Sequence, residues 1–269
     1  MMLINGETTA LLPVSDRGLQ YGDGLFETLA VIDGEPRQWR RHMARLAKGC
    51  RALQLPLPDS DLLLAEAIQL CRDESQAVLK LIITRGSGGR GYRYADEIGA
   101  TRILSIHPWP DYPSHYYQQG ATLTLCETPL GINPRLAGIK HLNRLEQVLA
   151  RNEWRGSDIQ EGVMCDVEGN VIEGTMSNLF IIEGERLITP DLSLCGVEGV
   201  VREAVLEIAR QCAIQTSIEL VSVERLKAAS ACFITNSLIG LWPVRRLDDI
   251  NYAQGEISQD LIQTLKAAI

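Results

Sequence analysis

Short alternating runs of apolar and polar residues open the chain, and turn-forming pairs follow them. Apolar residues 3–4 precede Asn5-Gly6, and the run 28–32 precedes Asp33-Gly34; such pairs favour tight hairpin turns. Farther along, apolar residues recur at the spacing of a helix face and then in runs typical of strands. The predicted elements are helices at 39–53 and 61–72 and strands at 78–84 and 102–107. We therefore expect residues 1–110 to form a small N-terminal α+β domain.

A proline-rich stretch follows, HPWPDYPSHYYQQG at residues 107–120, and it has little periodicity. Such a stretch is typical of a connection between domains, so residues 111–120 are expected to be an interdomain linker. The predicted elements beyond it are strands at 121–126, 213–219 and 231–235, helices at 141–154, 200–212 and 257–268, and tightly turned strands between 161 and 190. Residues 121–269 are expected to form a larger C-terminal domain, mostly sheet with flanking helices.

The composition is that of a globular chain with an acidic balance. With 269 residues and 45% apolar content, the chain can bury a substantial core. The formal net charge of −8 argues against nucleic-acid or anionic-membrane binding, so an anionic ligand needs a local cluster of basic residues. The start MMLINGETTALL lacks the features of a signal peptide, and no apolar stretch approaches the roughly 20 residues of a spanning helix. A cytoplasmic location is expected.

Neither a metal site nor a hydrolase site is indicated. The seven cysteines contain no C-x-x-C pair and no histidine at metal-ligand spacing, so we expect reduced, mostly buried thiols and predict no metal. No G-x-S-x-G elbow supplies a nucleophilic serine. The histidines are scattered, at His42, His107, His115 and His141.

Residues 86–91, GSGGRG, match the dinucleotide-binding pattern G-x-G-x-x-G and follow a predicted strand. A dinucleotide turn must open a helix whose first amides face the pyrophosphate, whereas a polar loop and another strand are predicted after Gly91. A dinucleotide site is therefore disfavoured. Two interpretations remain, a glycine-rich connection between strands or a mobile substrate loop that presents Arg90 and Tyr92.

Lys140 follows a run of small and apolar residues, 136–139, and stands at the start of a predicted helix. Such surroundings can desolvate an amine and free its neutral, nucleophilic form. Lysines are rarely buried, so on these residues alone an ordinary solvated lysine is the commoner interpretation. The motifs around it change this assessment.

Six motifs span nearly the whole chain in a fixed order. They are SDRGLQYGDGLFET (15–28), HMARL (42–46), IKHLNRLEQ (139–147), VIEGTMSNLF (171–180), GVEGVVRE (196–203) and TNSLIGLWPV (235–244). In this order and spacing they resemble the class IV, or fold-type IV, pyridoxal-phosphate (PLP) enzymes, which include branched-chain and D-amino acid aminotransferases and aminodeoxychorismate lyases. Within the family, RGSGGRGY (85–92) and NPRLAGIKHLNRLEQ (133–147) resemble the lyases rather than the aminotransferases.

The resemblance implies a two-domain α+β or α/β fold of type IV with PLP at the domain interface. It also implies a lyase that converts 4-amino-4-deoxychorismate into 4-aminobenzoate and pyruvate, a step of folate biosynthesis. The alternative is a class IV aminotransferase acting on D-amino acids or branched-chain amino acids. Most aminotransferase relatives have a tyrosine shortly after the lysine, whereas Asn143 and Arg144 stand here, which favours the lyase. A non-catalytic PLP-binding or interaction protein on the same fold is disfavoured because Lys140, Arg45 and Glu173 are intact.

Cofactor roles are likewise implied by the resemblance. Lys140 binds PLP covalently and serves as the catalytic base, and Glu173 pairs with the pyridine nitrogen, which keeps the ring an electron acceptor. The phosphate is assigned to Arg45, Ser237, the backbone amides of Val200 and Val201 and, more weakly, Asn236. The two amides have an independent rationale, since they open the predicted helix after Gly199 and a helix N-terminus favours phosphate.

Substrate and partner expectations follow from the same resemblance. Arg90 and Tyr92 align with carboxylate-binding positions of the D-amino acid aminotransferases, where the loop reaches across from the other subunit, so a homodimer is expected. A guanidinium suits the two carboxylates of the implied substrate. Arg17 and Arg85 are further candidates without an assigned role. A functional link to aminodeoxychorismate synthase is a further expectation.

Overall fold

The computed structural model describes residues 1–96, 98–252 and 263–264. Contacts divide the chain into two units. Unit 1 consists of Met1–Pro110 with Ile139–Asn143, and unit 2 consists of Asp111–Gly138 with Arg144–Ile269. Residues 111–120, expected as a linker, thus belong to unit 2, and the segment that carries Lys140 belongs to unit 1 rather than to the later part of the chain.

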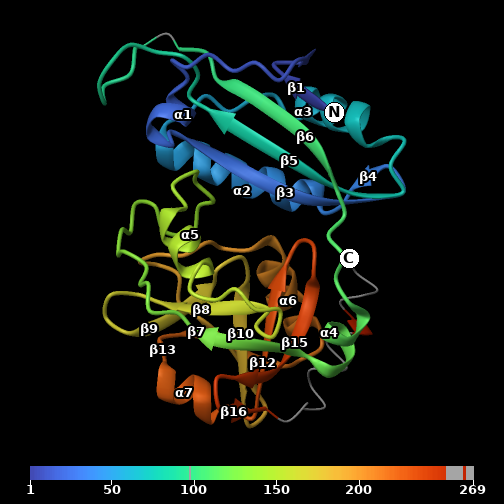
Figure 1. The fold of residues 1–269 in the computed structure, drawn as a ribbon, viewed down its shortest axis with the longest axis vertical. Coiled ribbons are helices and arrows are strands. Elements are labelled where there is room, and N and C mark those ends of the chain that lie inside the picture. Colours follow the sequence, from blue (N-terminus) through green and yellow to red (C-terminus); the bar gives the residue numbers. More distant parts are fainter. Residues whose placement is uncertain (97, 253–262, 265–269) are drawn as a thin grey trace. The chain divides into compact units, whose positions relative to one another are not determined.

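Unit 1 is built on an antiparallel sheet with the strand order β2-β1-β6-β5-β3-β4 (Figure 1). The strands are β1 (Met2–Ile4), β2 (Glu7–Thr8), β3 (Gly24–Ile32), β4 (Glu35–Pro36), β5 (Gln76–Thr84) and β6 (Thr101–Pro108). β3 and β5 pair along nine residues each, with Leu25 opposite Ile83 and Leu29 opposite Leu79. These four side chains are buried, which gives the sheet its apolar core.

The described part of unit 1 contains three helices, α1 (Arg17–Tyr21), α2 (Trp39–Leu53) and α3 (Ser60–Cys71). α2 lies against β3, and Leu46 and Cys50 are buried on its inner face. The approach is close at Gly49, where a Cβ atom would lie 2.7 Å from the Leu25 side chain. α3 begins at the Asp59 cap, whose side chain accepts from the amides of Asp61 and Leu62. The prediction for α2 is confirmed, and that for α3 is correct within one residue at each end.

The predicted helix 141–154 is wrong in its first part. Lys140 to Leu142 run along β3 instead: the Phe26 amide donates to the Lys140 carbonyl (3.0 Å), and the Leu142 amide donates to the Gly24 carbonyl (3.0 Å). The physical reason is that β4 pairs with β3 only at Val31 and Ile32, so the early backbone groups of β3 need another partner on that edge. The helix itself, α5, is restricted to Leu145–Arg151.

Unit 2 contains a mixed sheet, in which the described strands follow the order β12-β11-β10-β14-β15-β7-β8-β9-β13, with β16 beside β15. The strands are β7 (Ala121–Leu125), β8 (Glu161–Cys165), β9 (Asn170–Gly174), β10 (Asn178–Glu183), β11 (Arg186–Pro190), β12 (Gln215–Glu219), β13 (Val221–Ser222), β14 (Ala231–Asn236), β15 (Gly240–Leu247) and β16 (Ile250–Asn251). The helices are α4 (Ser114–Gln119), α5, α6 (Val200–Gln211) and α7 (Val223–Ala228). β11, α6 and β12 form a β-α-β crossover, because β11 and β12 pair in parallel.

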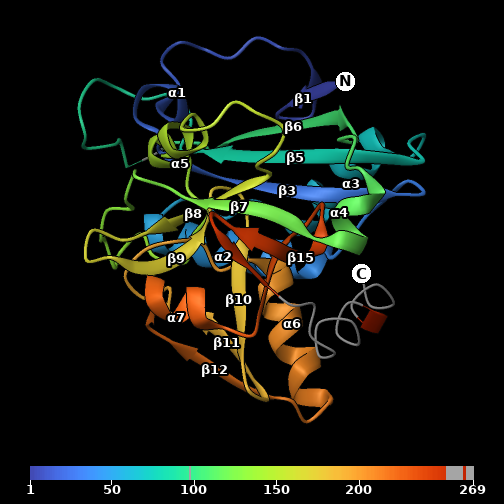
Figure 2. The same ribbon diagram turned by 60° about the horizontal axis from the view of Figure 1, so that its bottom comes forward.

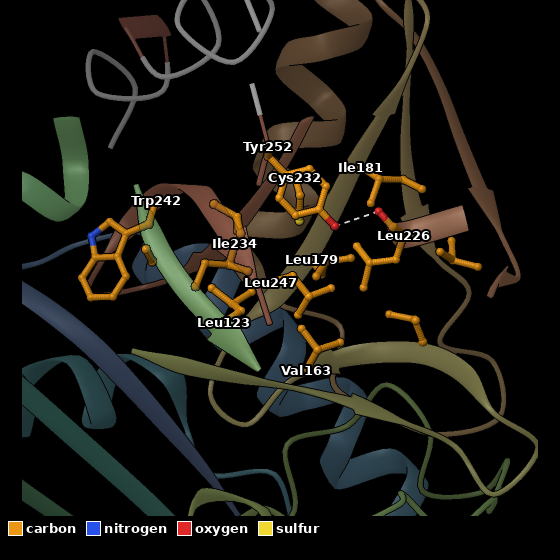
Figure 3. Packing of buried hydrophobic residues seen from close by; sticks show 14 of the residues in the cluster. Leu123, Val163, Leu179, Ile181, Leu226, Cys232, Ile234, Trp242, Leu247 and Tyr252 are labelled. Carbon is orange, nitrogen blue, oxygen red and sulfur yellow. Dashed lines mark hydrogen bonds between the residues drawn. The ribbon is translucent and has the colours of Figure 1, made fainter. Parts of the chain in front are cut away.

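The main core of unit 2 gathers residues from β7, β8, β10, β14 and β15, with Trp242 and Leu247 among those labelled in Figure 3. Tyr252 closes one side of it, where its hydroxyl donates to the Leu226 carbonyl at 2.7 Å. Tyr112 and Tyr116 place their rings 5.0 and 5.2 Å from the Trp242 ring, so the proline-rich segment is packed onto this core.

α6 lies beside β10 and β11 in Figure 2 and covers a second apolar cluster. Its buried Val201 and Val205 pack with Phe180 and Phe233, whose rings stack at 4.9 Å. The prediction for this helix, 200–212, is confirmed to within one residue. The predicted last helix, 257–268, lies almost wholly outside the described residues. Among the described residues, no helix is both long enough and apolar enough to cross a membrane.

Candidate active site

A buried cluster of charged groups lies between β3 and α2 in unit 1. Glu27 is 1% exposed in the otherwise apolar strand β3. Arg45 donates to it through Nε (2.9 Å) and Nη2, and the His42 Nδ1 atom lies 2.6 Å from Oε2. His42 and Arg45 are three residues apart on α2, so they share one helix face. This carboxylate holds the proposed phosphate ligand in place, a feature that the sequence analysis missed.

Electrostatics keep the Glu27 cluster ionised. Burial alone would raise the pKa of Glu27, but the Arg45 charge and the hydrogen bonds from His42 and Arg45 outweigh it and lower the pKa to about 2. Burial lowers the pKa of His42 below its usual value; the hydrogen bond and charge of Glu27 oppose this shift, and the charges of Arg45 and Lys140 add to it. Because an ionised carboxylate can only accept, the Nδ1–H of His42 is the donor to Glu27.

Lys140 lies close to this cluster within unit 1. Its Nζ atom lies 4.3 Å from the centroid of the Phe26 ring, next to Glu27 on β3. The structure thus brings Lys140 and Arg45 into one neighbourhood, since the charges of both reach His42. The aromatic face favours a cation, so it holds the amine at a defined place when the amine is protonated.

The described residues of the 86–100 segment form a loop that leads into the strand β6, as predicted. Arg90 is exposed, and Tyr92 is 89% exposed, with its ring centroid 5.7 Å from that of Tyr21 in an edge-to-face arrangement. Arg17 and Arg85, by contrast, are buried. Both pair with Asp23, at 2.9 and 2.8 Å.

Glu173 lies near the end of β9 in unit 2 and is 4% exposed. Its Oε2 atom accepts a hydrogen bond from the Val197 amide at 2.8 Å, which fixes the carboxylate against the loop that precedes α6. That loop needs glycine at 196, where φ is +85° and a Cβ atom would lie 2.8 Å from Ile172 Cγ2. Burial lowers the pKa of Arg144, whereas the charge of Glu173 raises it, so this arginine lies within electrostatic reach of the carboxylate.

The N-terminus of α6 begins close to Glu173 along the same loop. Gly199 is the capping residue and supplies no side-chain hydrogen bond to the first turn, which Val200 and Val201 open. A Cβ atom at Gly199 would lie 2.0 Å from Oδ1 of Asn178, whose Nδ2 donates to the Val197 carbonyl at 2.8 Å. The missing side chain of Gly199 thus allows the chain to come close to Asn178, and the Asn178 hydrogen bond holds it there.

Asn236 ends β14 and shapes the turn that contains Ser237. Its Oδ1 accepts from the amides of Leu238 (2.8 Å) and Ile239 (2.9 Å), while its Nδ2 donates to the Met176 carbonyl (3.2 Å). These contacts show that Asn236 stabilises the turn. From the sequence it is predicted only as a donor to the cofactor phosphate.

A second buried carboxylate that the sequence analysis missed supports the turn after Glu173. Glu161 of β8 is fully buried and accepts from the side chains of Thr175 and Ser177 and from nearby amides. The only sequence signal is an acidic residue at the start of an apolar strand. The two carboxylate oxygens of Glu161 accept these hydrogen bonds and so hold residues 174–177 in a tight reversal between β9 and β10.

The family model of the class IV aminotransferases matches residues 24–247, which include the Glu27 cluster, Lys140 and Glu173. The chain belongs to the class IV aminotransferase family. As a family member it is 36% identical to an aminodeoxychorismate lyase of Vibrio harveyi over 265 residues, which cover 97% of this chain and 98% of that protein. The family assignment made from the motifs is therefore confirmed.

Solved structures agree with the class IV assignment. The crystal structure of 4-amino-4-deoxychorismate lyase from Pseudomonas aeruginosa superposes with a TM-score of 0.97 at 46% identity, covering 100% of this chain and 99% of that one. A hypothetical aminotransferase from Mycobacterium tuberculosis, in a PLP-bound form, gives a TM-score of 0.84 at 22% identity and covers 100% of this chain and 98% of its own. The second likeness concerns the fold alone, and the expectation of a fold-type IV architecture is confirmed.

Proposed function

We propose that this chain is a PLP-dependent lyase that converts 4-amino-4-deoxychorismate into 4-aminobenzoate and pyruvate. The observation that carries the proposal is its full-length similarity, in sequence and in structure, to lyases named for this substrate. The atoms of the substrate equal those of the two products, so the reaction needs no further reactant. Because 4-aminobenzoate is a folate precursor, the enzyme serves folate biosynthesis and is linked in function to aminodeoxychorismate synthase, which supplies the substrate.

The residues present fit PLP. A buried carboxylate fixed by an amide suits the pyridine nitrogen at Glu173, an arginine held by a carboxylate suits the phosphate at Arg45, and Lys140 offers an amine to the aldehyde. When bound, PLP acts as an electron sink for charge on the substrate carbon that bears nitrogen. Glu173 sustains this property by keeping the ring nitrogen protonated.

Lys140 acts twice in the proposed mechanism. Its amine would hold the cofactor through the aldehyde, and as a free amine it would remove the proton from the substrate carbon that bears nitrogen. The electron pair left by that proton would then expel the enolpyruvyl oxygen, which makes the ring aromatic. The enolpyruvate released takes up one proton at its methylene carbon and becomes pyruvate. The Phe26 ring beside Nζ supports this proposal, because it limits the directions in which the amine can point.

Phosphate binding is assigned to Arg45, the amides of Val200 and Val201, Ser237 and Asn236. The first amides of a helix have no partner within the helix and carry the positive end of its dipole, so they favour an anion. The close approach at Gly199 supports the proposal, since a side chain there would displace the start of α6.

The substrate carboxylates are assigned to Arg90 and Tyr92, on the exposed loop of unit 1. We also propose a homodimer in which this loop serves the other subunit. Apolar side chains at the surface of α5 support self-association: Leu145 is 77% exposed, and Val148 and Leu149 lie beside it.

The seven free thiols fit a reducing compartment, so we place the enzyme in the cytoplasm.

The second candidate is an aminotransferase on the same fold, which would return the proton to the cofactor carbon instead of expelling pyruvate. Asn143 follows the lysine where most aminotransferase relatives have a nearby tyrosine. Its Nδ2 donates to the Gly22 carbonyl at 3.1 Å, so it is engaged in holding a turn of unit 1. An asparagine in place of that tyrosine favours the lyase.

Incubation with 4-amino-4-deoxychorismate tests the proposal. We expect 4-aminobenzoate and pyruvate in equal amounts, measured by chromatography and a coupled dehydrogenase assay. Absence of both, with amino transfer from D-alanine or leucine to a keto acid, would establish the aminotransferase instead.

Lys140→Ala should lose turnover and the visible absorption of lysine-bound cofactor while remaining folded, and a retained band would refute the role of Lys140.

A further inference from the structure

Two arginines of unit 1 point inward rather than toward a substrate. Arg17 and Arg85 are each 3% exposed, and both pair with Asp23. Burial would raise the pKa of Asp23, but hydrogen bonds from both guanidinium groups lower it below its usual value. The three side chains therefore form an ionised cluster inside the unit, and neither arginine is presented as a carboxylate ligand.

The remaining donors of the two arginines go to different parts of the chain. Arg85 donates to the carbonyls of Leu53 (2.8 Å) and Gln54 (2.9 Å) at the end of α2. Arg17 donates through Nη1 to the Gly91 carbonyl (2.8 Å) and through Nη2 to the Tyr92 carbonyl (3.1 Å). Arg17 thus forms hydrogen bonds with the backbone of the two residues that follow Arg90.

Further contacts bind the same loop to α1. The Arg17 amide donates to the Gly86 carbonyl at 2.9 Å, and the Gly91 amide donates to the Tyr21 hydroxyl at 3.2 Å. The Arg17 guanidinium lies 4.8 Å from the centroid of the Tyr21 ring, which in turn meets the Tyr92 ring. α1 therefore forms a support for the loop, with Arg17 at its centre.

We propose that Arg17 is a positioning residue that fixes the direction in which the loop presents Arg90 and Tyr92 to a substrate carboxylate. The inference rests on the proposed function, because it takes this loop as the one that meets the dicarboxylate. A guanidinium binds a carboxylate through two parallel bonds only in the right orientation. The four glycines between 86 and 91 give the loop backbone many accessible conformations. The Arg17 contacts restrict these conformations in the free enzyme, so less conformational entropy is lost when the substrate binds.

Substrate kinetics of Arg17→Gln provide the first test. The amide is shorter and uncharged, so it cannot pair with Asp23 and hold both carbonyls. We expect KM for 4-amino-4-deoxychorismate to rise about tenfold or more while kcat stays within about twofold, since only the ordering of the loop is lost. The absorption of bound PLP and its dissociation constant should match wild type, which a general structural defect would not allow.

Limited trypsin digestion provides a second test that needs no substrate. Trypsin cleaves after Arg90 and Arg93, both within the loop. Cleavage at these two bonds, followed by mass spectrometry, should be about fivefold faster in Arg17→Gln because the loop opens more often. This measurement judges the anchoring even if wild type fails to convert the substrate, a result that would contradict the proposed function alone.

Arg102→Gln is the matched control, because Arg102 forms a comparable pair with Glu66 on α3 at 2.7 Å. It should keep wild-type KM and loop cleavage. Arg17→Lys keeps the charge beside Asp23 and should restore part of the substrate affinity. If Arg17→Gln does not fold, Tyr21→Phe, which removes the acceptor of the Gly91 amide, should raise both KM and cleavage about twofold to fivefold.

Two results would overturn the proposal. One is an Arg17→Gln enzyme, or a Tyr21→Phe enzyme where the first does not fold, with wild-type KM and wild-type cleavage of the loop. The other is a parallel fall in kcat, PLP affinity and unfolding free energy without a separate effect on KM, which would make Arg17 a purely structural residue.

Discussion

Glu27 shows how one side chain can link stability to the site. A lone carboxylate in an apolar strand is costly, so its presence in β3 requires partners. Arg45 and His42 supply them from a single face of α2. In satisfying the carboxylate, they also fix the guanidinium proposed to meet the cofactor phosphate.

Acid should therefore destabilise the protein through Glu27. Its folded pKa of about 2 lies below the ordinary 4.5, so its contribution is present above pH 4.5 and is lost as the pH falls toward 2. The contribution is on the order of 3 kcal/mol. Urea unfolding at pH 7, 5 and 3 should show a steeper loss in wild type than in Glu27→Gln. Equal pH dependence of the two proteins would contradict the prediction.

Glu173→Gln tests the carboxylate of unit 2. The amide oxygen can still accept from the Val197 amide, so the loop before α6 should stay in place. The neutral side chain no longer holds a proton on the cofactor ring nitrogen, so we expect kcat to fall about 10²-fold or more. Visible absorption should show that the cofactor remains bound. A kcat near that of wild type would argue against the pairing of Glu173 with the ring.

At the scale of elements, the turn between β9 and β10 depends on Glu161. Burial raises the pKa of this carboxyl, and its hydrogen bonds to Thr175 and Ser177 oppose the shift. Glu161→Ala should lower the unfolding free energy by about 3 kcal/mol or more, because it leaves several buried donors unpaired. Urea denaturation measures this loss.

Glu153→Ala is the control for Glu161→Ala. Glu153 also accepts two backbone amides, from Glu127 and Thr128, but at the surface, where water can replace it. We expect it to cost less than about 1 kcal/mol. If the two variants lose equal stability, burial is not what makes Glu161 important.

Periodicity predicted the elements that are stabilised by their own amphipathic faces. α2 and α6 are of this kind, and their bounds were predicted closely. The segment around Lys140 was predicted as helix because its pattern is local, whereas its structure is decided by the free edge of β3 more than a hundred residues earlier. Such pairing between distant segments leaves no periodic signal.

The same limit applies to the candidate site. Glu27 lies in the motif GLFET and His42 and Arg45 lie in HMARL, yet nothing in either motif indicates that they bind one another. An acidic residue within an apolar strand was the available signal. Arg17 and Arg85 were indistinguishable from substrate ligands in sequence, since only their burial against Asp23 reveals their inward direction.

At the scale of the whole molecule, the proposed homodimer determines which subunit supplies Arg90 to each site. A chain with Lys140→Ala lacks the catalytic amine but keeps its loop, and a chain with Arg90→Ala lacks the loop arginine but keeps the amine. If the loop serves the other subunit, a mixed dimer contains one complete site. Unfolding the two variants together and refolding them should then restore about a quarter of wild-type activity, because about half the dimers are mixed and each has one working site.

The pair Lys140→Ala and Glu173→Gln distinguishes this arrangement from simple subunit exchange. Both residues are assigned to the cofactor of a single chain, so in a mixed dimer the site that keeps Lys140 still carries the Glu173 substitution. Activity should stay at the average of the separate variants. If the Arg90 pair behaves in the same way while native mass spectrometry shows mixed dimers, the loop acts within its own subunit, and α5 then associates subunits without completing their sites.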